Sequence, residues 1–182
     1  MPLNTGYLKS NRTKSGDDMF TPFYAVEPII KYIPKNKKIW MPFDEEWSAF
    51  YQRFTELGYN VIRSSLSDGH DFFKYEPDEY DIIISNPPFS MKDKVLERLY
   101  HLNKPFAILL PVNSIQGTKR FNYFSKGIQL LIFDARMGFH NSESMDIPVE
   151  GTPFATGYFC KDVLPNDLIL ERLEKFERKL GV

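Results

Sequence analysis

Short apolar runs alternate with amphipathic stretches along most of the chain. The runs predict six β-strands, over residues 38–42, 59–63, 80–85, 106–110, 128–133 and 154–159. A shorter run, Asp71-Phe72-Phe73, predicts a seventh strand. Residues 80–85 contain three consecutive isoleucines, which is typical of a central parallel strand buried on both faces.

Apolar residues at helical spacing predict four helices, over residues 22–33, 45–57, 91–102 and 166–180. Thr21 is placed to cap the first helix, and Pro22 suits its first turn. Pro28 lies inside this helix, which predicts a kink or a break into two short pieces. Gly58 is placed to end the second helix.

The alternation of strands and helices predicts an α/β fold, a Rossmann-like, seven-stranded, mostly parallel sheet with helices on both faces. No helix is predicted between the last two strands of the sheet, so this pair should form a hairpin that makes one strand antiparallel. In such sheets ligands bind beyond the carboxyl ends of the strands. A functional site is therefore expected directly after Pro42, Arg63, Phe73, Ser85 and Pro111.

Length and composition fit one globular domain. The chain has 182 residues, of which 42% are hydrophobic and 26% charged. This is enough for one sizeable core and too little for two ordinary domains. Residues 1–19 are polar and predict a flexible N-terminal arm, so we expect a single domain over residues 20–182.

The net charge of −1 excludes a protein that binds nucleic acid through its overall charge. Any contact with nucleic acid must therefore come from a local patch. Basic residues do cluster near the N-terminus, although an ordinary solvated surface is the simpler explanation for them: Lys9, Arg12 and Lys14.

Several features predict a cytoplasmic protein. The single cysteine, Cys160, cannot form an internal disulfide and favours a reducing compartment. The N-terminus lacks the pattern of a signal peptide, and no apolar run approaches the roughly 20 residues of a membrane span, so no membrane contact is expected. The histidines lack Cys or His companions at ligand spacing, which predicts no metal site: His70, His101 and His140.

The strongest candidate for chemistry is the turn Asn86-Pro87-Pro88-Phe89, which follows the predicted central strand. Its prolines stiffen the turn because each fixes φ and lacks an N–H donor. A stiff turn fixes the Asn86 amide and the Pro87 carbonyl, which together can accept both hydrogens of an exocyclic amino group and direct its lone pair at an electrophile. Phe89 offers a flat face to a planar group. A turn with a purely structural role is the alternative.

The segment Ser85-Asn86-Pro87-Pro88-Phe89-Ser90 resembles the [N/D/S]-P-P-[Y/F/W] motif of S-adenosylmethionine-dependent amino-methyltransferases, in the N-P-P-F form found among N6-adenine enzymes. The compact, phage-type DNA adenine methyltransferases are the group that the chain resembles most. The resemblance covers residues 20–160. It implies a class I methyltransferase fold, S-adenosylmethionine as cofactor, and a catalytic set at the turn itself: Asn86, Pro87, Pro88 and Phe89.

The resemblance also implies cofactor contacts elsewhere. Asp71-Phe72 resembles the position whose acidic residue, in this family, accepts from the adenine amine of the cofactor, although Asp71 could also be a strand-edge residue. Thr21-Pro22 resembles the T-P motif that contacts the methionine part of the cofactor, and a simple helix start explains it equally well. Asn86 would contact the cofactor as well as the acceptor.

The loop after the first strand departs from the family. Members usually carry an Asp-Pro-x-x-Gly-x-Gly type of loop, whose glycines let the backbone approach the cofactor. Residues 41–48 contain no glycine. Pro42-Phe43 keeps part of the pattern, and Asp44 or Glu45 could bind the amino group or the ribose of the cofactor.

Two further places are less informative. The second strand ends at Arg63-Ser64-Ser65, without the carboxylate expected for the ribose hydroxyls, and the next carboxylate is Asp68. In related enzymes aromatic residues between the last two strands help to hold the target base. Phe139, Asn141 and Phe154 lie there, and core packing explains Phe154 equally well.

The implied function is methyl transfer to an exocyclic amino group, with N6 of adenine in DNA favoured over RNA as the acceptor. The chain leaves no room for a target-recognition domain. Recognition is then minimal, or a protein partner supplies it, or the substrate is single-stranded or RNA. The alternatives are a glutamine or rRNA amino-methyltransferase, and a catalytically degenerate binding partner that keeps the fold, which the glycine-free loop motivates.

Overall fold

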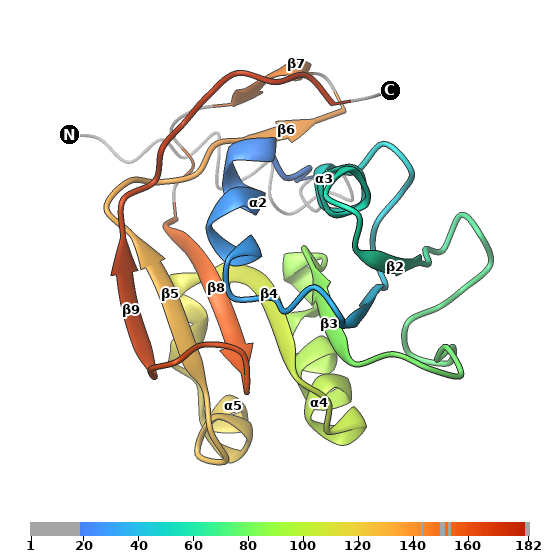
Figure 1. Ribbon diagram of the computed structural model, residues 1–182. Helices are drawn as coiled ribbons and strands as arrows, with labels where there is room; N and C mark the ends of the chain where they lie inside the picture. Colours follow the sequence, from blue (N-terminus) through green and yellow to red (C-terminus); the bar gives the residue numbers. More distant parts are fainter. Residues whose placement is uncertain (1–18, 143, 150–151, 153, 181–182) are drawn as a thin grey trace.

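The computed structural model describes residues 19–180 apart from residues 143, 150–151 and 153. A seven-stranded sheet has the order β2-β1-β3-β4-β8-β5-β9, and β8 runs antiparallel to both of its neighbours (Figure 1). The other paired strands of this sheet are parallel, so the predicted α/β architecture is confirmed. The strands are β1 (Lys38–Met41), β2 (Asn60–Arg63), β3 (Ile82–Ser85), β4 (Phe106–Pro111), β5 (Gln129–Phe133), β8 (Thr156–Lys161) and β9 (Leu168–Glu171).

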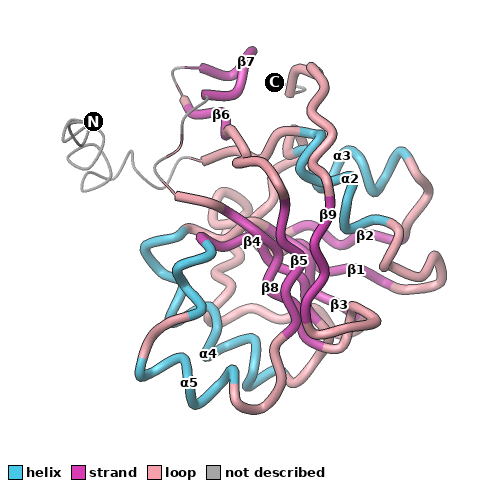
Figure 2. The backbone as a smooth tube through the Cα atoms, turned by 90° about the vertical axis from the view of Figure 1, so that its left-hand side faces the viewer, coloured by secondary structure: helices cyan, strands magenta, loops and turns pink. Residues whose placement is uncertain are grey.

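Helices cover both faces of the sheet (Figure 2). On one face, α2 (Phe23–Ile30) and α3 (Ala49–Glu56) pack against strand residues such as Ile84. On the other face, α4 (Lys92–Leu102) and α5 (Thr118–Phe124) pack against strand residues such as Ile83. Successive strand residues point to opposite faces, so the continuous apolar runs of β3 and β4 supply both cores at once.

The first two helices are shorter than predicted. The first begins after Pro22 and ends at Ile30, two residues beyond Pro28. It is therefore one helix of eight residues, and the second piece suggested by Pro28 is absent from this stretch. The second begins at Ala49 rather than at residue 45, because the preceding residues form the loop that leads out of β1.

The predicted strand Asp71-Phe72-Phe73 is wrong, since the segment forms a turn. The Asp71 side chain accepts a hydrogen bond from the backbone N–H of Phe73 at 3.0 Å, and its carbonyl accepts from Lys74 and Tyr75. Side chains of this type stabilise turns in competition with strand pairing. Phe72 is buried against Trp40, so its apolar character reflects packing of the turn onto the sheet.

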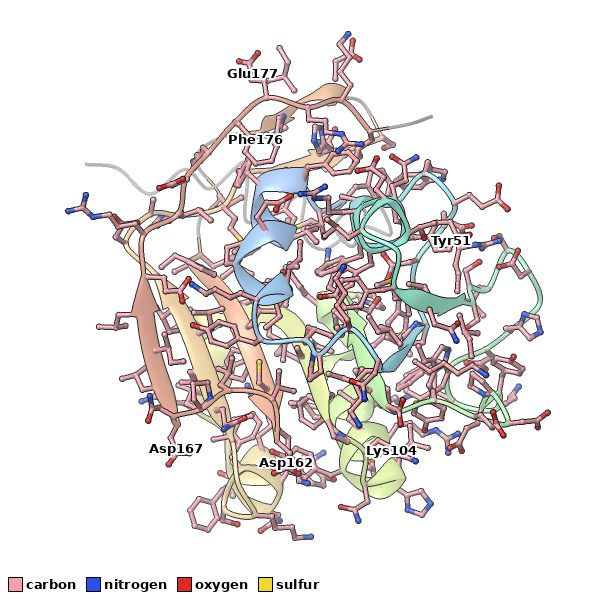
Figure 3. The ribbon with its side chains drawn as sticks, in the orientation of Figure 1. Tyr51, Lys104, Asp162, Asp167, Phe176 and Glu177 are labelled. Carbon is pink, nitrogen blue, oxygen red and sulfur yellow. The ribbon has the colours of Figure 1, made fainter. Side chains whose placement is uncertain are left out.

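The predicted helix over residues 166–180 is also wrong. Residues 168–171 form β9, which pairs in parallel with the free edge of β5. Residues 172–180 have no regular secondary structure and cross over α2, where Phe176 lies against Tyr24 (Figures 1 and 3). The sequence shows no polar–apolar alternation here, since Leu168, Ile169 and Leu170 are all apolar, and the pairing with β5 determines the strand.

The segments on either side of β5 hold elements that the sequence did not predict. The polar stretch before it contains η3 (Val112–Ile115) and α5. Between β5 and β8, β6 (Phe139–Asn141) and β7 (Ser144–Val149) form a separate two-stranded sheet. Of the predicted N-terminal arm, residues 1–18 lie outside the described part of the chain, together with Lys9, Arg12 and Lys14.

Candidate active site

A cavity of about 470 Å³ opens at the carboxyl ends of β1, β2 and β3. Its wall comes from the loops that follow these strands, from the segment before α2, and from Leu180 near the end of the chain. This is the edge of the sheet at which a site was predicted. The cavity is lined by nine of the predicted residues: Thr21, Pro42, Phe43, Asp44, Glu45, Asp71, Phe72, Asn86 and Pro88.

Asn86 begins the turn after β3 and contributes to the cavity wall. Its Nδ2 donates to the backbone carbonyl of Met19 at 2.7 Å, which fixes the orientation of the amide. Its Oδ1 is buried and has no hydrogen-bond partner among the described residues. An unsatisfied buried acceptor costs about 1–3 kcal/mol. The site therefore offers an oriented amide oxygen to a donor.

The turn that carries Asn86 is stiff. Pro87 is buried, and Pro88 has φ −60° and ψ 122°, an extended conformation that ends where η2 (Phe89–Met91) begins. Each proline removes one rotatable φ angle from the connection between β3 and α4. Pro88 contacts the cavity, whereas Pro87 is not part of its wall.

Phe89 lies outside the cavity wall, within an aromatic cluster. Its ring meets Phe139 edge-on at a centroid distance of 6.0 Å and Phe154 at 5.7 Å. The three rings come from η2, from β6 and from the connection before β8. The structure thus brings Phe89 together with Phe139 and Phe154, which the resemblance suggested near a target base, and none of the three lines the cavity.

Asp71 lies in the cavity wall, in the turn held against the sheet by Phe72. The Phe72 ring packs on Phe43 at 4.9 Å and on Trp40 at 5.4 Å. One Asp71 oxygen accepts from the Phe73 N–H, and the other lies 3.7 Å from the Lys74 ammonium. Pro22, by contrast, precedes the first residue of α2 and does not line the cavity.

Asp44 is a carboxyl group buried beneath the cavity. It is only 4% exposed, and Ser85 donates to its Oδ2 at 2.5 Å. Burial raises the pKa of Asp44 to about 7, although hydrogen bonds from Ser85 and Ser48 act in the opposite direction. Ser85 precedes Asn86, so this hydrogen bond ties the loop after β1 to the start of the Asn86 turn.

Glu45, the next residue, belongs to a polar cluster at the end of β2. Ser67 donates to both of its oxygens, at 2.7 and 3.0 Å, and the Arg63 guanidinium lies 3.5 Å away. Arg63 also pairs with Asp68 at 2.5 Å. This ion pair holds the pKa of Asp68 below its usual value, and Asp68 is not part of the cavity wall.

Sequence reasoning missed several lining residues. Phe20 and Trp47 meet edge-on at 4.7 Å, and both contact the cavity. His70 lines it as well, with its Nδ1 buried and without a hydrogen-bond partner. The position of His70 just after β2 was a usable signal. No local pattern pointed to Leu180, which lies 89 residues beyond Met91, the lining residue that precedes it in sequence.

None of the helices among the described residues is both long enough and apolar enough to cross a membrane. The His, Cys, Asp and Glu side chains of the same residues form no group of three or more that could hold a metal ion.

No family model and no curated protein sequence matches the chain. Among solved structures, a dimethyladenosine transferase from Plasmodium falciparum is 12% identical with a TM-score of 0.44, and the match covers 78% of this chain and 62% of that one. A Listeria monocytogenes protein described as a class I S-adenosylmethionine-dependent methyltransferase is 14% identical with a TM-score of 0.49, covering 94% and 71%. Identities and TM-scores this low do not define the function of this chain.

Proposed function

We propose that the protein is an S-adenosylmethionine-dependent methyltransferase that acts on an exocyclic amino group, N6 of adenine in DNA. The observation that carries the proposal is the unpartnered, buried Oδ1 of Asn86 at the carboxyl end of the central strand β3. An acceptor held in this way, in a stiff Asn-Pro-Pro turn beside a cavity, suits an amino group that must be oriented before it reacts.

The residues that line the cavity fit the proposed cofactor. An adenine amine needs an acceptor, which Asp71 supplies in the wall, and the adenine ring needs apolar surface, which Phe43 and Phe72 supply. When bound, S-adenosylmethionine supplies an electrophilic methyl group on a positively charged sulfur. Thr21, Pro42 and Asp44 line the same cavity and complete the proposed binding set.

The side chains of the turn then orient the acceptor. Asn86 Oδ1 accepts one hydrogen of the amino group and the Pro87 carbonyl accepts the other, which directs the nitrogen lone pair at the methyl group. Phe89 provides an aromatic face beside the acceptor base, supported edge-on by Phe139 and Phe154. No base has to act before the attack, because the nitrogen becomes acidic only once it carries the methyl group.

Adenine in nucleic acid is the acceptor class that this arrangement favours. A planar base with one exocyclic –NH₂ matches both the paired acceptors and the aromatic cluster. We place DNA before RNA because of the N-P-P-F form of the turn and the Thr21-Pro22 segment ahead of the first strand. A protein partner that supplies target recognition is compatible with this proposal.

The first test is calorimetric titration of the purified protein with S-adenosylmethionine and S-adenosylhomocysteine. We expect both to bind, and we expect Asp71→Ala to weaken both. Absence of binding at millimolar ligand would contradict the proposed methyltransferase activity and favour a catalytically degenerate partner protein that keeps the fold.

The second test is methyl transfer from labelled S-adenosylmethionine to single-stranded and duplex DNA, to RNA and to glutamine-containing peptides. We expect label on N6 of adenine in DNA. Asn86→Ala should lower turnover by about 10²–10³-fold while cofactor affinity stays within about threefold, since it removes an oriented acceptor. The matched control is Asn166→Ala, an exposed residue outside the cavity, which should leave both quantities unchanged. Unchanged turnover in Asn86→Ala, or label on RNA or glutamine only, would overturn the assignment.

A further inference from the structure

The sheet order determines which loop lies under the middle of the proposed cofactor. This inference rests on the proposed function. β1 lies between β2 and β3 in the sheet, Asp71 follows β2, and Asn86 follows β3. A cofactor with its adenine at Asp71 and its sulfur at Asn86 must therefore pass over the loop that follows β1. That loop is the one that lacks glycine.

The two carboxylates of this loop accept hydrogen bonds from opposite sides of β1. Asp44 receives its hydrogen bond from Ser85, at the end of β3. Glu45 receives its hydrogen bonds from Ser67, beyond β2, and faces Arg63 at the end of β2. Both carboxylates line the cavity. Glu45 thus lies on the adenine side of β1 and Asp44 on the sulfur side.

We propose that Glu45 and Asp44 divide the recognition of the cofactor, Glu45 accepting the ribose hydroxyls and Asp44 holding the positively charged amino-acid and sulfonium end. In this chain two side chains would therefore replace contacts that a glycine-rich loop makes through its backbone. The ribose would then be bound by the loop after β1 and not by a carboxylate at the end of β2, where this chain has Arg63.

The surroundings of Glu45 suit a ribose. Its side chain is 31% exposed, so its oxygens remain accessible from the cavity. It already accepts from one hydroxyl, that of Ser67, and two ribose hydroxyls present the same donor chemistry. Arg63 lies 3.5 Å from its Oε2 and holds the carboxylate in place from the side of β2. Hydrogen bonds to an ionised carboxylate are stronger than neutral ones.

The surroundings of Asp44 suit a cation. The groups that face it are Ser48 at the start of α3, Ser85 on β3, Arg63 on β2, Glu45 in its own loop and Tyr158 on β8. Of these only Arg63 is positive, and it is engaged by Asp68, Glu45 and Glu46. Burial therefore leaves the Asp44 charge poorly compensated, and a cation bound in the cavity would compensate it.

The test compares the affinities of three ligands that carry two, one and no positively charged groups. S-adenosylmethionine carries the sulfonium and the ammonium, S-adenosylhomocysteine only the ammonium, and 5′-methylthioadenosine neither, while all three keep the ribose. Glu45→Gln should weaken all three by about tenfold. Asp44→Asn should weaken S-adenosylmethionine by about tenfold, S-adenosylhomocysteine less, and leave 5′-methylthioadenosine within about twofold.

Proton release gives a second readout that needs no turnover. Since the pKa of Asp44 lies at about 7, the group is half protonated near neutral pH, and a bound cation favours its ionised form. Binding of S-adenosylmethionine at pH 7 should release about half a proton from the wild-type protein and none from Asp44→Asn. Titrations in buffers of different ionisation enthalpy measure this number.

Glu46→Gln is the matched control. Glu46 is adjacent in sequence, its side chain is 80% exposed, it faces Arg63 at 3.6 Å, and it does not line the cavity. We expect this variant to bind all three ligands as the wild type does, and circular dichroism should show all variants folded. The proposed division of cofactor recognition between Glu45 and Asp44 would be overturned by either of two results. One is that Glu46→Gln and Glu45→Gln lower the affinities equally, and the other is that Asp44→Asn lowers the affinity for all three ligands equally. If the wild-type protein binds none of the three, the cofactor proposal itself fails, which is a distinct result.

Discussion

The cavity has two walls that are held in different ways. The strand-end wall consists of the lining residues that follow β1, β2 and β3, and the chain-end wall consists of Met19, Phe20, Thr21 and Leu180. Behind the strand-end wall lie strands such as β3 and β4, whose residues are all buried. In the chain-end wall, Leu180 is the only buried residue of the stretch 174–180. The strand-end wall is therefore backed by the buried residues of β1 and β3, whereas the chain-end wall is formed by segments from the two ends of the described chain.

The anchoring of Phe20 shows the same contrast on a smaller scale. Its backbone exchanges two hydrogen bonds with His140, at 2.8 and 2.9 Å, in an isolated bridge. Its ring meets Trp47 edge-on. This bridge lies outside the seven-stranded sheet, so Phe20 is anchored apart from the strands that carry the strand-end wall. Asn86 joins the two walls, since its amide donates to the Met19 carbonyl.

The largest effect should come from Trp40→Ala, beneath the strand-end wall. Trp40 is fully buried, donates to Ser64 at 2.9 Å, and packs on Phe72 and Tyr80. Removing a buried aromatic side chain costs about 3–5 kcal/mol, so the free energy of unfolding in urea should fall by that amount. Phe176→Ala, in the exposed C-terminal segment, should cost less than about 1 kcal/mol. Similar losses in the two variants would break the comparison.

The next effect concerns the pH dependence of stability. The pKa of Asp44 rises from 3.8 to about 7 on folding because the group is buried. Between these pH values the folded protein keeps a proton that the unfolded chain has released, so the free energy of unfolding falls as pH rises through this window. The variant Asp44→Asn has no charge to bury at this position, and it should therefore be more stable than the wild type at pH 8, by about 2–4 kcal/mol.

Urea unfolding of both proteins at pH 5 and pH 8 measures this difference. The difference in the free energy of unfolding between variant and wild type should be smaller at pH 5 than at pH 8, because only part of the window between the two pKa values lies below pH 5. Parallel curves would show that Asp44 does not titrate in this range. A variant that is more stable and yet binds S-adenosylmethionine more weakly would separate the role of this carboxylate in binding from its role in the fold.

About half of the strand-end wall could be predicted from the sequence. The buried run of β3 and the two prolines after it identified Asn86, and the resemblance to amino-methyltransferases pointed to Asp44 and Asp71, which both line the cavity. These inferences succeeded because each depends on a few neighbouring residues. Their roles in catalysis and cofactor binding stay predictions.

Apart from Thr21, the chain-end wall could not be predicted, because it depends on contacts between distant segments. Whether residues 168–171 become a strand depends on the free edge of β5, which local spacing does not report. Once β9 replaces the expected helix, the following residues cross α2 and bring Leu180 to the cavity. The strand predicted over residues 71–73 was wrong for a different reason. The aromatic residues are typical of a strand, but the Asp71 side chain accepts a hydrogen bond from the Phe73 N–H and stabilises a turn.

The smallest effect should come from Leu180→Ala in the chain-end wall. Leu180 is 8% exposed and belongs to the larger hydrophobic core, so burial alone would suggest a loss as large as that of other core leucines, about 2–5 kcal/mol. We expect less than about 1 kcal/mol, because the segment before it is exposed and can detach locally without unfolding the sheet.

Affinity for S-adenosylmethionine should fall by about two- to fivefold in the same variant, since an apolar contact in the cavity is lost. Leu170→Ala, on the edge strand β9 and 72% exposed, is the control and should change neither quantity. If Leu180→Ala instead costs as much stability as Trp40→Ala, the end of the chain is part of the cooperative core. Access to the cavity would then require partial unfolding, and the two walls would behave as one.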